Sequence, residues 1–190
     1  MILYGSTTSP FVRRIRIFAH AIDFEFNNID IFSEQGRKLL KAKNPTLKVP
    51  FLVDDNAHIY DSRIIFNYLS DKFELSKLSW QQQNTLTLID AATDSLVQML
   101  ILGRSGFDTS DDAMYFKMQR ERIATVLTAL NKQCLDGDFA QWQYPSICLY
   151  CLLDWAIYRE LADLSEYSAL TNFWQTHNQR VDVKDTDPRA

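Results

Sequence analysis

Three short polar segments of this chain contain residue types that could bind a small ligand or take part in its chemistry. The first is Thr8-Ser9-Pro10, where a serine precedes a proline after an apolar run. Proline at the first helical position with serine before it is typical of a capped helix start. A helix N-terminus also offers N–H donors and positive dipole charge to an anion, and a hydroxyl there could hydrogen-bond a thiolate. Ser9 is therefore predicted to be a helix cap, and the same hydroxyl could also favour a thiolate, since the two roles are compatible.

The second segment is Lys48-Val49-Pro50. The proline pushes Val49 toward an extended conformation and removes the N–H group at position 50. This pattern either starts a strand or presents the Val49 N–H and C=O groups to an extended peptide, which would pair with them like an added strand. The sequence leaves the isomer of the Val49-Pro50 bond open.

The third segment is Asp61-Ser62, at the expected start of a helix. Either residue is a suitable N-cap. The alternative is recognition of a free α-amino acid end. Its carboxylate would meet the helix N-terminus and the Ser62 hydroxyl, and its ammonium group would pair with Asp61.

The elements around these segments predict a small α/β domain over residues 1–74. Short β-branched or aromatic runs alternate with helical patterns there. The expected strands are 2–4, 24–31, 51–53 and 58–60, and the expected helices are 11–21, 35–43 and 62–73. The order is βαβ followed by ββα, in which a helical crossover joins the parallel strands and a tight turn joins the last pair. This is a thioredoxin-like layout.

Residues 80–190 carry no strand signal and predict an all-α, helical-bundle domain. Expected helices span 80–102, 112–135, 146–161 and 167–176, and the polar tail 178–190 is expected to be a surface extension. Asp90, Asp94, Gln98 and Arg104 recur along the first of these helices, as a solvated face or as side chains directed at a site.

Composition excludes several classes of function. Of the 190 residues, 46% are apolar, and the formal net charge is −4 with scattered basic residues, so we expect a folded core and no nucleic-acid partner. No apolar run approaches a membrane span, and the first residues do not resemble a signal peptide, so we expect no membrane association and a cytoplasmic location. The three cysteines, Cys134, Cys148 and Cys151, suit a reducing compartment. The three histidines show no metal-ligand spacing, so we expect no metal.

Taken together, the three segments resemble the glutathione S-transferase family. MILYGSTTSPFVRRIRI is similar to the first strand and helix of bacterial members, NPTLKVPFLVDD to the segment with the family's cis-proline, and YDSRIIFNYL to its γ-glutamyl-binding helix start. YPSICLYCLLDWAIYRE resembles the family's buried helix, with Ser146 as its cap, although Leu149 stands where many members have an acidic residue.

The resemblance implies that glutathione is the substrate that these segments bind. Ser9 would face the glutathione sulfur as the catalytic residue, Val49 would pair with the cysteinyl backbone, and Asp61 and Ser62 would hold the γ-glutamyl end. Thr8 and Lys48 are further candidates for this site. A hydrophobic co-substrate would lie between the two domains, near Phe11, Gln98 and Arg104, and the protein would be a homodimer.

The expected function is conjugation of the glutathione thiolate to a small hydrophobic electrophile. A non-catalytic interaction protein of the same fold, like the stringent starvation proteins, is one alternative, and a glutathione-dependent isomerase or peroxidase is another. The chain has no cysteine before Cys134, which disfavours thiol–disulfide exchange through a protein thiol.

Overall fold

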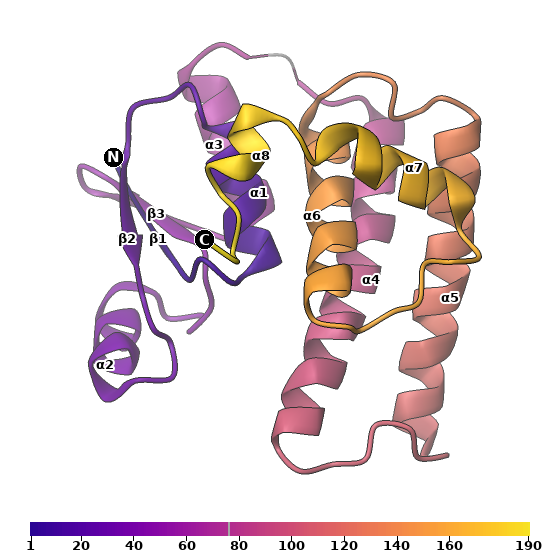
Figure 1. Cartoon of the computed structure of the whole chain (residues 1–190). Helices are drawn as coiled ribbons and strands as arrows, with labels where there is room; N and C mark the ends of the chain where they lie inside the picture. Colours follow the sequence, from indigo (N-terminus) through magenta and orange to yellow (C-terminus); the bar gives the residue numbers. More distant parts are fainter. Residues whose placement is uncertain (76) are drawn as a thin grey trace. The chain divides into compact units, whose positions relative to one another are not determined.

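The computed structural model of this chain describes residues 1–75 and 77–190 (Figure 1). The chain forms two compact units. The first comprises residues 1–77 together with 180–190, and the second comprises residues 78–179. The fold is a mixed α/β domain of thioredoxin-like layout combined with an all-helical region, which confirms the predicted fold class.

The first unit is built on a four-stranded sheet in the order β2-β1-β3-β4. The strands are β1 (Ile2–Gly5), β2 (Glu25–Asn28), β3 (Phe51–Asp54) and β4 (Ala57–Tyr60). β1 and β2 are parallel, whereas β3 is antiparallel to both β1 and β4. Helix α1 (Pro10–Phe18) makes the crossover between the parallel strands, α2 (Glu34–Lys43) precedes β3, and α3 (Ser62–Lys72) follows β4.

Alternation along the strands fills a core on each face of this sheet. Tyr4 and Phe51 stack with ring centroids 4.7 Å apart and pack with Leu40 of α2. The neighbouring residues Leu3 and Leu52 point the other way, toward α1 and α3. Both faces of the sheet are covered by helices, so successive residues of β1 and β3 are mostly apolar. This is why the short apolar runs in the sequence predicted strands.

The segment 180–190 differs from the prediction. We expected it to be a surface extension of the helical domain, but the structure groups it with the first unit, where Val181–Lys184 form a short helix, α8. The buried Arg13 of α1 donates hydrogen bonds to the Val183 carbonyl at 3.1 Å and to the Thr186 hydroxyl at 3.4 Å. We predicted that the second domain extends to residue 190, but the second unit ends at residue 179. Nothing in the sequence indicated this difference, because residues 13 and 183 are far apart along the chain.

The second unit consists of four helices: α4 (Trp80–Arg104), α5 (Met114–Leu135), α6 (Tyr144–Tyr158) and α7 (Ser168–His177). Helix α6 is buried on all sides from Tyr144 to Ala156, as expected for a helix that is apolar all round. It begins two residues before the predicted start. Ser146 is therefore inside the first turn rather than at the cap, and its hydroxyl donates to the Gln141 carbonyl at 2.6 Å.

Helix α4 is long and apolar enough to cross a membrane by length and composition alone. One such helix is weak evidence for a span, because the core helix of a soluble protein passes the same test. Its buried face includes Leu86, Ile89 and Leu96, and it packs against α5 and α6. One face of α4 thus packs within the second unit.

Candidate active site

The register of the sheet brings the three predicted segments to one edge of the first unit. Tyr4 of β1 pairs with Phe51 of β3, and Phe51 pairs with Tyr60 of β4. Because both pairs are antiparallel, the end of β1, the start of β3 and the end of β4 lie at the same edge. The chain there leaves β1 into the loop before α1, enters β3 from Val49 and leaves β4 at Asp61, on adjacent strands about 4.8 Å apart.

Ser9 is the N-cap of α1, as one of the two interpretations of its sequence predicts. Its hydroxyl oxygen accepts a hydrogen bond from the Val12 N–H at 3.4 Å. A hydroxyl that accepts through its oxygen keeps its hydrogen for donation, so the cap is compatible with a hydrogen bond to a thiolate. Gly5 allows α1 to lie close to the sheet, since a Cβ atom at that position would be 2.4 Å from the Val12 side chain.

Thr8 is half-buried in the loop between β1 and α1. Its hydroxyl is 3.1 Å from the Ser6 hydroxyl, and the Ser9 N–H donates to the Ser6 carbonyl at 3.0 Å. The Thr7 N–H donates to the Asn28 side chain at 3.2 Å, which ties the loop to the end of β2. These contacts hold the backbone that leads into Ser9.

Val49 is half-buried, and the Val49-Pro50 peptide bond is cis, which answers the question that the sequence left open. Within the described residues, no hydrogen bond joins the Val49 N–H or C=O group to another group. The preceding turn is fixed by Asn44, whose side-chain amide donates to the Lys48 carbonyl at 2.8 Å. The Lys48 side chain is exposed. Val49 thus has backbone groups available to an extended peptide.

Asp61 is the N-cap of α3 and has φ of +71° and ψ of 138°. Its Oδ1 atom accepts from the Arg63 N–H at 2.8 Å, and its side chain is exposed. Positive φ is uncommon outside glycine, and such conformations are concentrated at functional sites. The carboxylate is thus held at the helix start with room for a cation beside it.

Ser62 is 1% exposed, and its hydroxyl oxygen accepts hydrogen bonds from the Arg14 guanidinium, from Nε at 3.0 Å and also from a terminal nitrogen. A hydroxyl whose oxygen accepts from two N–H groups acts toward a ligand as a donor. The positive charge of Arg14 and the N-terminus of α3 both favour an anion at this place.

Arg14 was missed in the sequence analysis. It is 3% exposed, and its guanidinium also lies over the Phe11 ring, 4.8 Å from the centroid. The available signal was the helix PFVRRIRIF, which places adjacent arginines within an apolar stripe. Because a charge on the buried side of a helix requires a polar partner, this pattern predicts a paired arginine, although it does not name the partner.

An ion pair between the buried Asp54 and the exposed Lys72 lies at the opposite end of β3 and β4. Asp54 accepts hydrogen bonds from Lys72 and, at 2.7 Å, from Tyr68. Both hydrogen bonds lower the pKa of the Asp54 carboxyl, and the bond from Lys72 has the larger effect. Burial of the carboxyl acts in the opposite direction but is outweighed. The pair joins α3 to the β3–β4 hairpin and has no part in the candidate site.

The three residues predicted to line a co-substrate pocket belong to different units. Phe11 is in the first unit, against Arg14, whereas Gln98 and Arg104 are on α4 in the second. The Gln98 side chain accepts a hydrogen bond from Tyr115, and Arg104 is exposed in the last turn of α4. The pocket remains a prediction. Over residues 1–75 and 77–190, no group of three or more potential metal ligands is found.

Comparison with known proteins relates this chain to glutathione S-transferases. Residues 3–77 match the family described as "Glutathione S-transferase, N-terminal domain". One curated relative, a "Probable maleylacetoacetate isomerase" of Caenorhabditis elegans, is 36% identical over 58 residues. That match covers 30% of this chain and only 27% of the relative's length.

Two solved structures are similar along almost the whole chain. A glutathione S-transferase of Methylobacillus flagellatus KT, with GSH bound, has a TM-score of 0.85 at 22% identity and covers 98% of both chains. A glutathione transferase family member of Pseudomonas fluorescens Pf-5, with bound glutathione, has a TM-score of 0.82 at 20% identity, again over 98% of both chains. At these identities the likeness establishes the fold. Residues 3–77 thus match the N-terminal domain model of the glutathione S-transferases, and the chain shares its fold with solved glutathione S-transferases.

Proposed function

We propose that this protein is a glutathione transferase, which binds glutathione along the sheet edge and directs its thiolate at a small hydrophobic electrophile. One observation carries the proposal. The ends of β1, β3 and β4 bring a capped helix start, a backbone with available hydrogen-bonding groups and a second capped helix start to one edge. Glutathione is a short extended peptide with a free amino acid at one end and a thiol in the middle, so each of its parts has a matching group.

The γ-glutamyl end would bind at the start of α3. Its carboxylate would accept from the Ser62 hydroxyl and lie near the Arg14 charge, and its ammonium group would pair with Asp61. The Val49 N–H and C=O groups would pair with the cysteinyl backbone. Thr8 and Lys48 flank the remaining length of the peptide, and the exposed Lys48 ammonium suits its glycyl carboxylate.

Catalysis would depend on the ionisation of the glutathione thiol. A free thiol has a pKa of about 8.5, so only a small fraction is thiolate at neutral pH. The Ser9 hydroxyl and the positive end of α1 would stabilise the thiolate by about 1–3 kcal/mol together. The thiolate then forms a C–S bond with the electrophilic carbon, and the leaving group departs with its electron pair.

The test is direct. Purified protein should be retained on immobilised glutathione and should conjugate glutathione to 1-chloro-2,4-dinitrobenzene, with release of chloride. Ser9→Ala should keep glutathione binding and lose most of the conjugation rate. Absence of both binding and conjugation in the wild-type protein would contradict the proposal, and binding without conjugation would leave a glutathione-binding protein that is not a transferase.

A second function, glutathione-dependent isomerisation, is supported by the match to a probable maleylacetoacetate isomerase. The same thiolate would add to a conjugated double bond, allow rotation about the resulting single bond and then be expelled, so that glutathione is regenerated. Incubation with maleylacetoacetate distinguishes the two functions, because an isomerase converts it without net consumption of glutathione, whereas a transferase consumes one glutathione per turnover.

We also propose a cytoplasmic homodimer. Within the described residues, the three cysteines of the chain form no disulfide with one another, which suits a reducing compartment. In the first unit, Ile64 on α3 is 53% exposed, and Phe73 and Leu75 just beyond α3 are 40% and 41% exposed. Exposed apolar side chains on one element favour association with a second copy. Sedimentation equilibrium should give twice the chain mass, and Ile64→Lys should shift the distribution to the monomer.

A further inference from the structure

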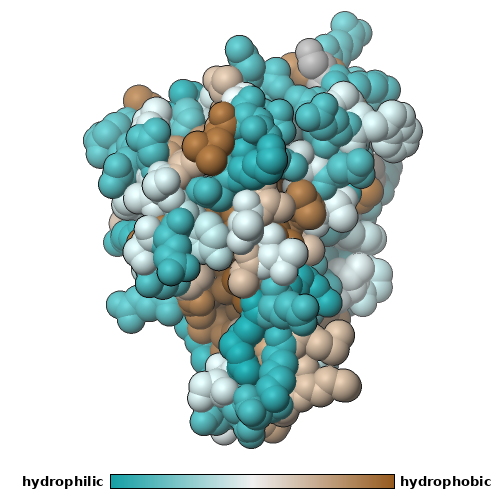
Figure 2. All heavy atoms as spheres, turned by 90° about the vertical axis from the view of Figure 1, so that its right-hand side faces the viewer, coloured by the Kyte–Doolittle hydropathy of each residue, from teal (hydrophilic) through white to brown (hydrophobic). Residues whose placement is uncertain are grey.

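The second unit contains a hollow of about 520 Å³ between the end of α5, the loop that follows it and α7. This volume falls within the range of about 300–1,000 Å³ that is usual for small-molecule sites. Figure 2 looks onto the side of the molecule that carries α5 and α7, where hydrophobic residues are visible among hydrophilic ones. None of the proposed glutathione-binding residues lines the hollow, so the proposed activity does not account for it.

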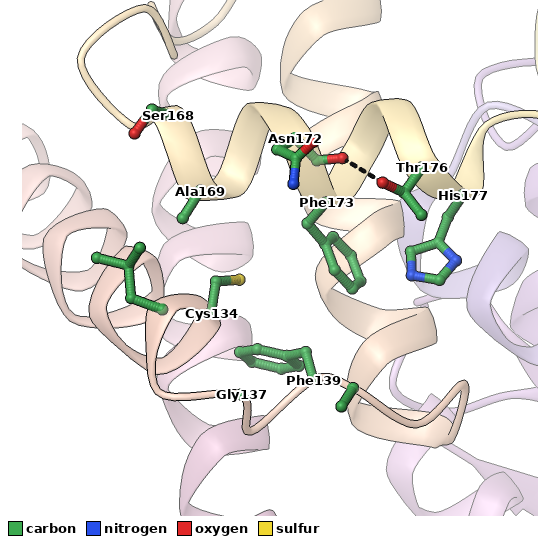
Figure 3. Close-up of a pocket in the computed structure, with 11 residues that line it drawn as sticks. Cys134, Gly137, Phe139, Ser168, Ala169, Asn172, Phe173, Thr176 and His177 are labelled. Atoms are coloured by element: carbon green, nitrogen blue, oxygen red, sulfur yellow. Dashed lines mark hydrogen bonds between the residues drawn. The ribbon is translucent and has the colours of Figure 1, made fainter.

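The walls of the hollow are apolar and partly aromatic. Phe139 of the loop and Phe173 of α7 have ring centroids 5.8 Å apart, and Ala140 and Ala169 flank them. The row of rings continues to His177, 4.6 Å from Phe173. Figure 3 shows Phe139 below and Phe173 above the space between loop and helix. Because aromatic rings pack well against other rings in tilted or offset arrangements, this row suits a flat aromatic ligand.

The residues that line the hollow also disfavour a charged ligand. None of the described residues that line the hollow is Asp, Glu, Lys or Arg. Burial and the nearby Asp138 raise the pKa of the Cys134 thiol to about 12, so this group is neutral at physiological pH. His177 is the one titratable group besides Cys134 among the lining residues described, so a ligand that is ionised while the imidazole is neutral would lose hydration here without gaining a charged partner, which is unfavourable.

Asn172 supplies one polar group at the rim. Its backbone carbonyl accepts from the Thr176 hydroxyl at 2.8 Å, but its side-chain amide has no hydrogen-bond partner within residues 1–75 and 77–190. In Figure 3 this amide lies on the side of α7 that faces the hollow. An amide both donates and accepts, so it would bind an N–H or O–H substituent on an aromatic ring.

We propose that this hollow is a second ligand site, which binds an uncharged aromatic molecule carrying one hydrogen-bonding substituent. The rings of Phe139 and Phe173 contact the aromatic system, and the Asn172 amide binds the substituent. The site lies wholly within the second unit and is separate from the residues proposed to bind glutathione.

The test uses two fluorescent probes with the same ring skeleton, N-phenyl-1-naphthylamine, which is neutral, and 8-anilino-1-naphthalenesulfonate, which is an anion. Both are titrated into the full chain in the presence of excess S-hexylglutathione, which occupies the proposed active site. The neutral probe should bind at least about tenfold more tightly than the sulfonate, since burial of an unpaired charge is costly. Equal affinities would overturn the assignment to uncharged ligands.

Two variants fill the hollow from opposite walls. Ala169→Phe on α7 and Ala140→Phe on the exposed loop should each weaken the neutral probe at least about tenfold by occupying its space. Ala124→Phe, on an exposed position of α5, is the matched control and should leave affinity unchanged. Asn172→Leu should weaken binding about threefold to tenfold through loss of the hydrogen bond. Unchanged affinity in a folded Ala169→Phe or Ala140→Phe variant would refute the site, whatever the outcome for glutathione.

Discussion

Replacement of Arg14 by methionine should destabilise the first unit and weaken glutathione binding. Methionine keeps an apolar stem but removes the guanidinium that donates twice to the Ser62 hydroxyl. A hydrogen bond from a charged donor contributes about 1.5–3 kcal/mol, and here both donors share one acceptor, so we expect a loss of about 2 kcal/mol in the free energy of unfolding. The loss of positive charge beside the γ-glutamyl carboxylate should raise the Kd of glutathione about tenfold, which corresponds to about 1.4 kcal/mol.

The assay has to separate the two units. Unfolding in urea is followed by far-UV circular dichroism, which reports on the whole chain, and by tryptophan fluorescence. All four tryptophans lie in the second unit, so their fluorescence follows that unit alone. We expect the Arg14→Met change to appear in the dichroism and to leave the tryptophan midpoint nearly unchanged. Isothermal titration calorimetry gives the Kd of glutathione.

A double-mutant cycle tests whether the pair acts as a unit. Ser62→Ala removes the acceptor from a buried guanidinium, and the double variant should lose less stability than the sum of the two single changes, by about 1.5–3 kcal/mol. Arg16→Met is the control on the same helix, because Arg16 lies over the Phe26 ring and bonds to the Asp185 carbonyl instead. If the two single losses add to within about 0.5 kcal/mol, the pairing of Arg14 with Ser62 does not support the site.

Four further changes probe other parts of the first unit. Ser9→Ala should lower the conjugation rate about tenfold to a hundredfold near neutral pH, and the deficit should shrink at alkaline pH, where the thiol ionises unaided; a deficit independent of pH would contradict this role. Asp61→Asn should weaken glutathione binding about tenfold, because glutathione loses an ion pair with its amino group. The binding of an analogue without the γ-glutamyl amino group should not change. Equal losses for both ligands would point to a purely structural role. The Lys72 hydrogen bond lowers the pKa of Asp54, so the stability that this pair contributes is complete above about pH 4 and is lost as the pH falls further. Asp54→Asn should therefore make the free energy of unfolding depend less on pH in the acid range. Removal of residues 180–190 should lower the unfolding temperature of the first unit, measured by circular dichroism, because it exposes the buried Arg13; an unchanged temperature would mean that this docking contributes no stability.

The strands, the helices and the positions of the three segments could be predicted because their signals are local. Alternation in Leu3 and Tyr4, the Ser9-Pro10 pair and the Asp61 cap each depend on neighbours a few residues away. Ser146 was misplaced because Pro145 fits within the first turn of a helix as well as before it.

The features that could not be predicted depend on distant partners. The Arg14–Ser62 contact spans 48 residues and requires α1 and α3 to be adjacent, which no local pattern specifies. The contact of Arg13 with Val183 spans 170 residues, and the polar composition of 180–190 gives no sign that it docks. Buried arginines indicated that partners exist, and only the fold identified them.

The return of residues 180–190 to the first unit has a consequence for biosynthesis. Residues 1–77 leave the ribosome first, but the surface that buries Arg13 is completed only after all of residues 78–179 have been made. Until then the nascent sheet domain lacks the segment that accepts the hydrogen bonds of the Arg13 guanidinium. The helical unit, which is continuous in sequence, can therefore finish folding before the domain that precedes it, so the order of completion reverses the order of synthesis.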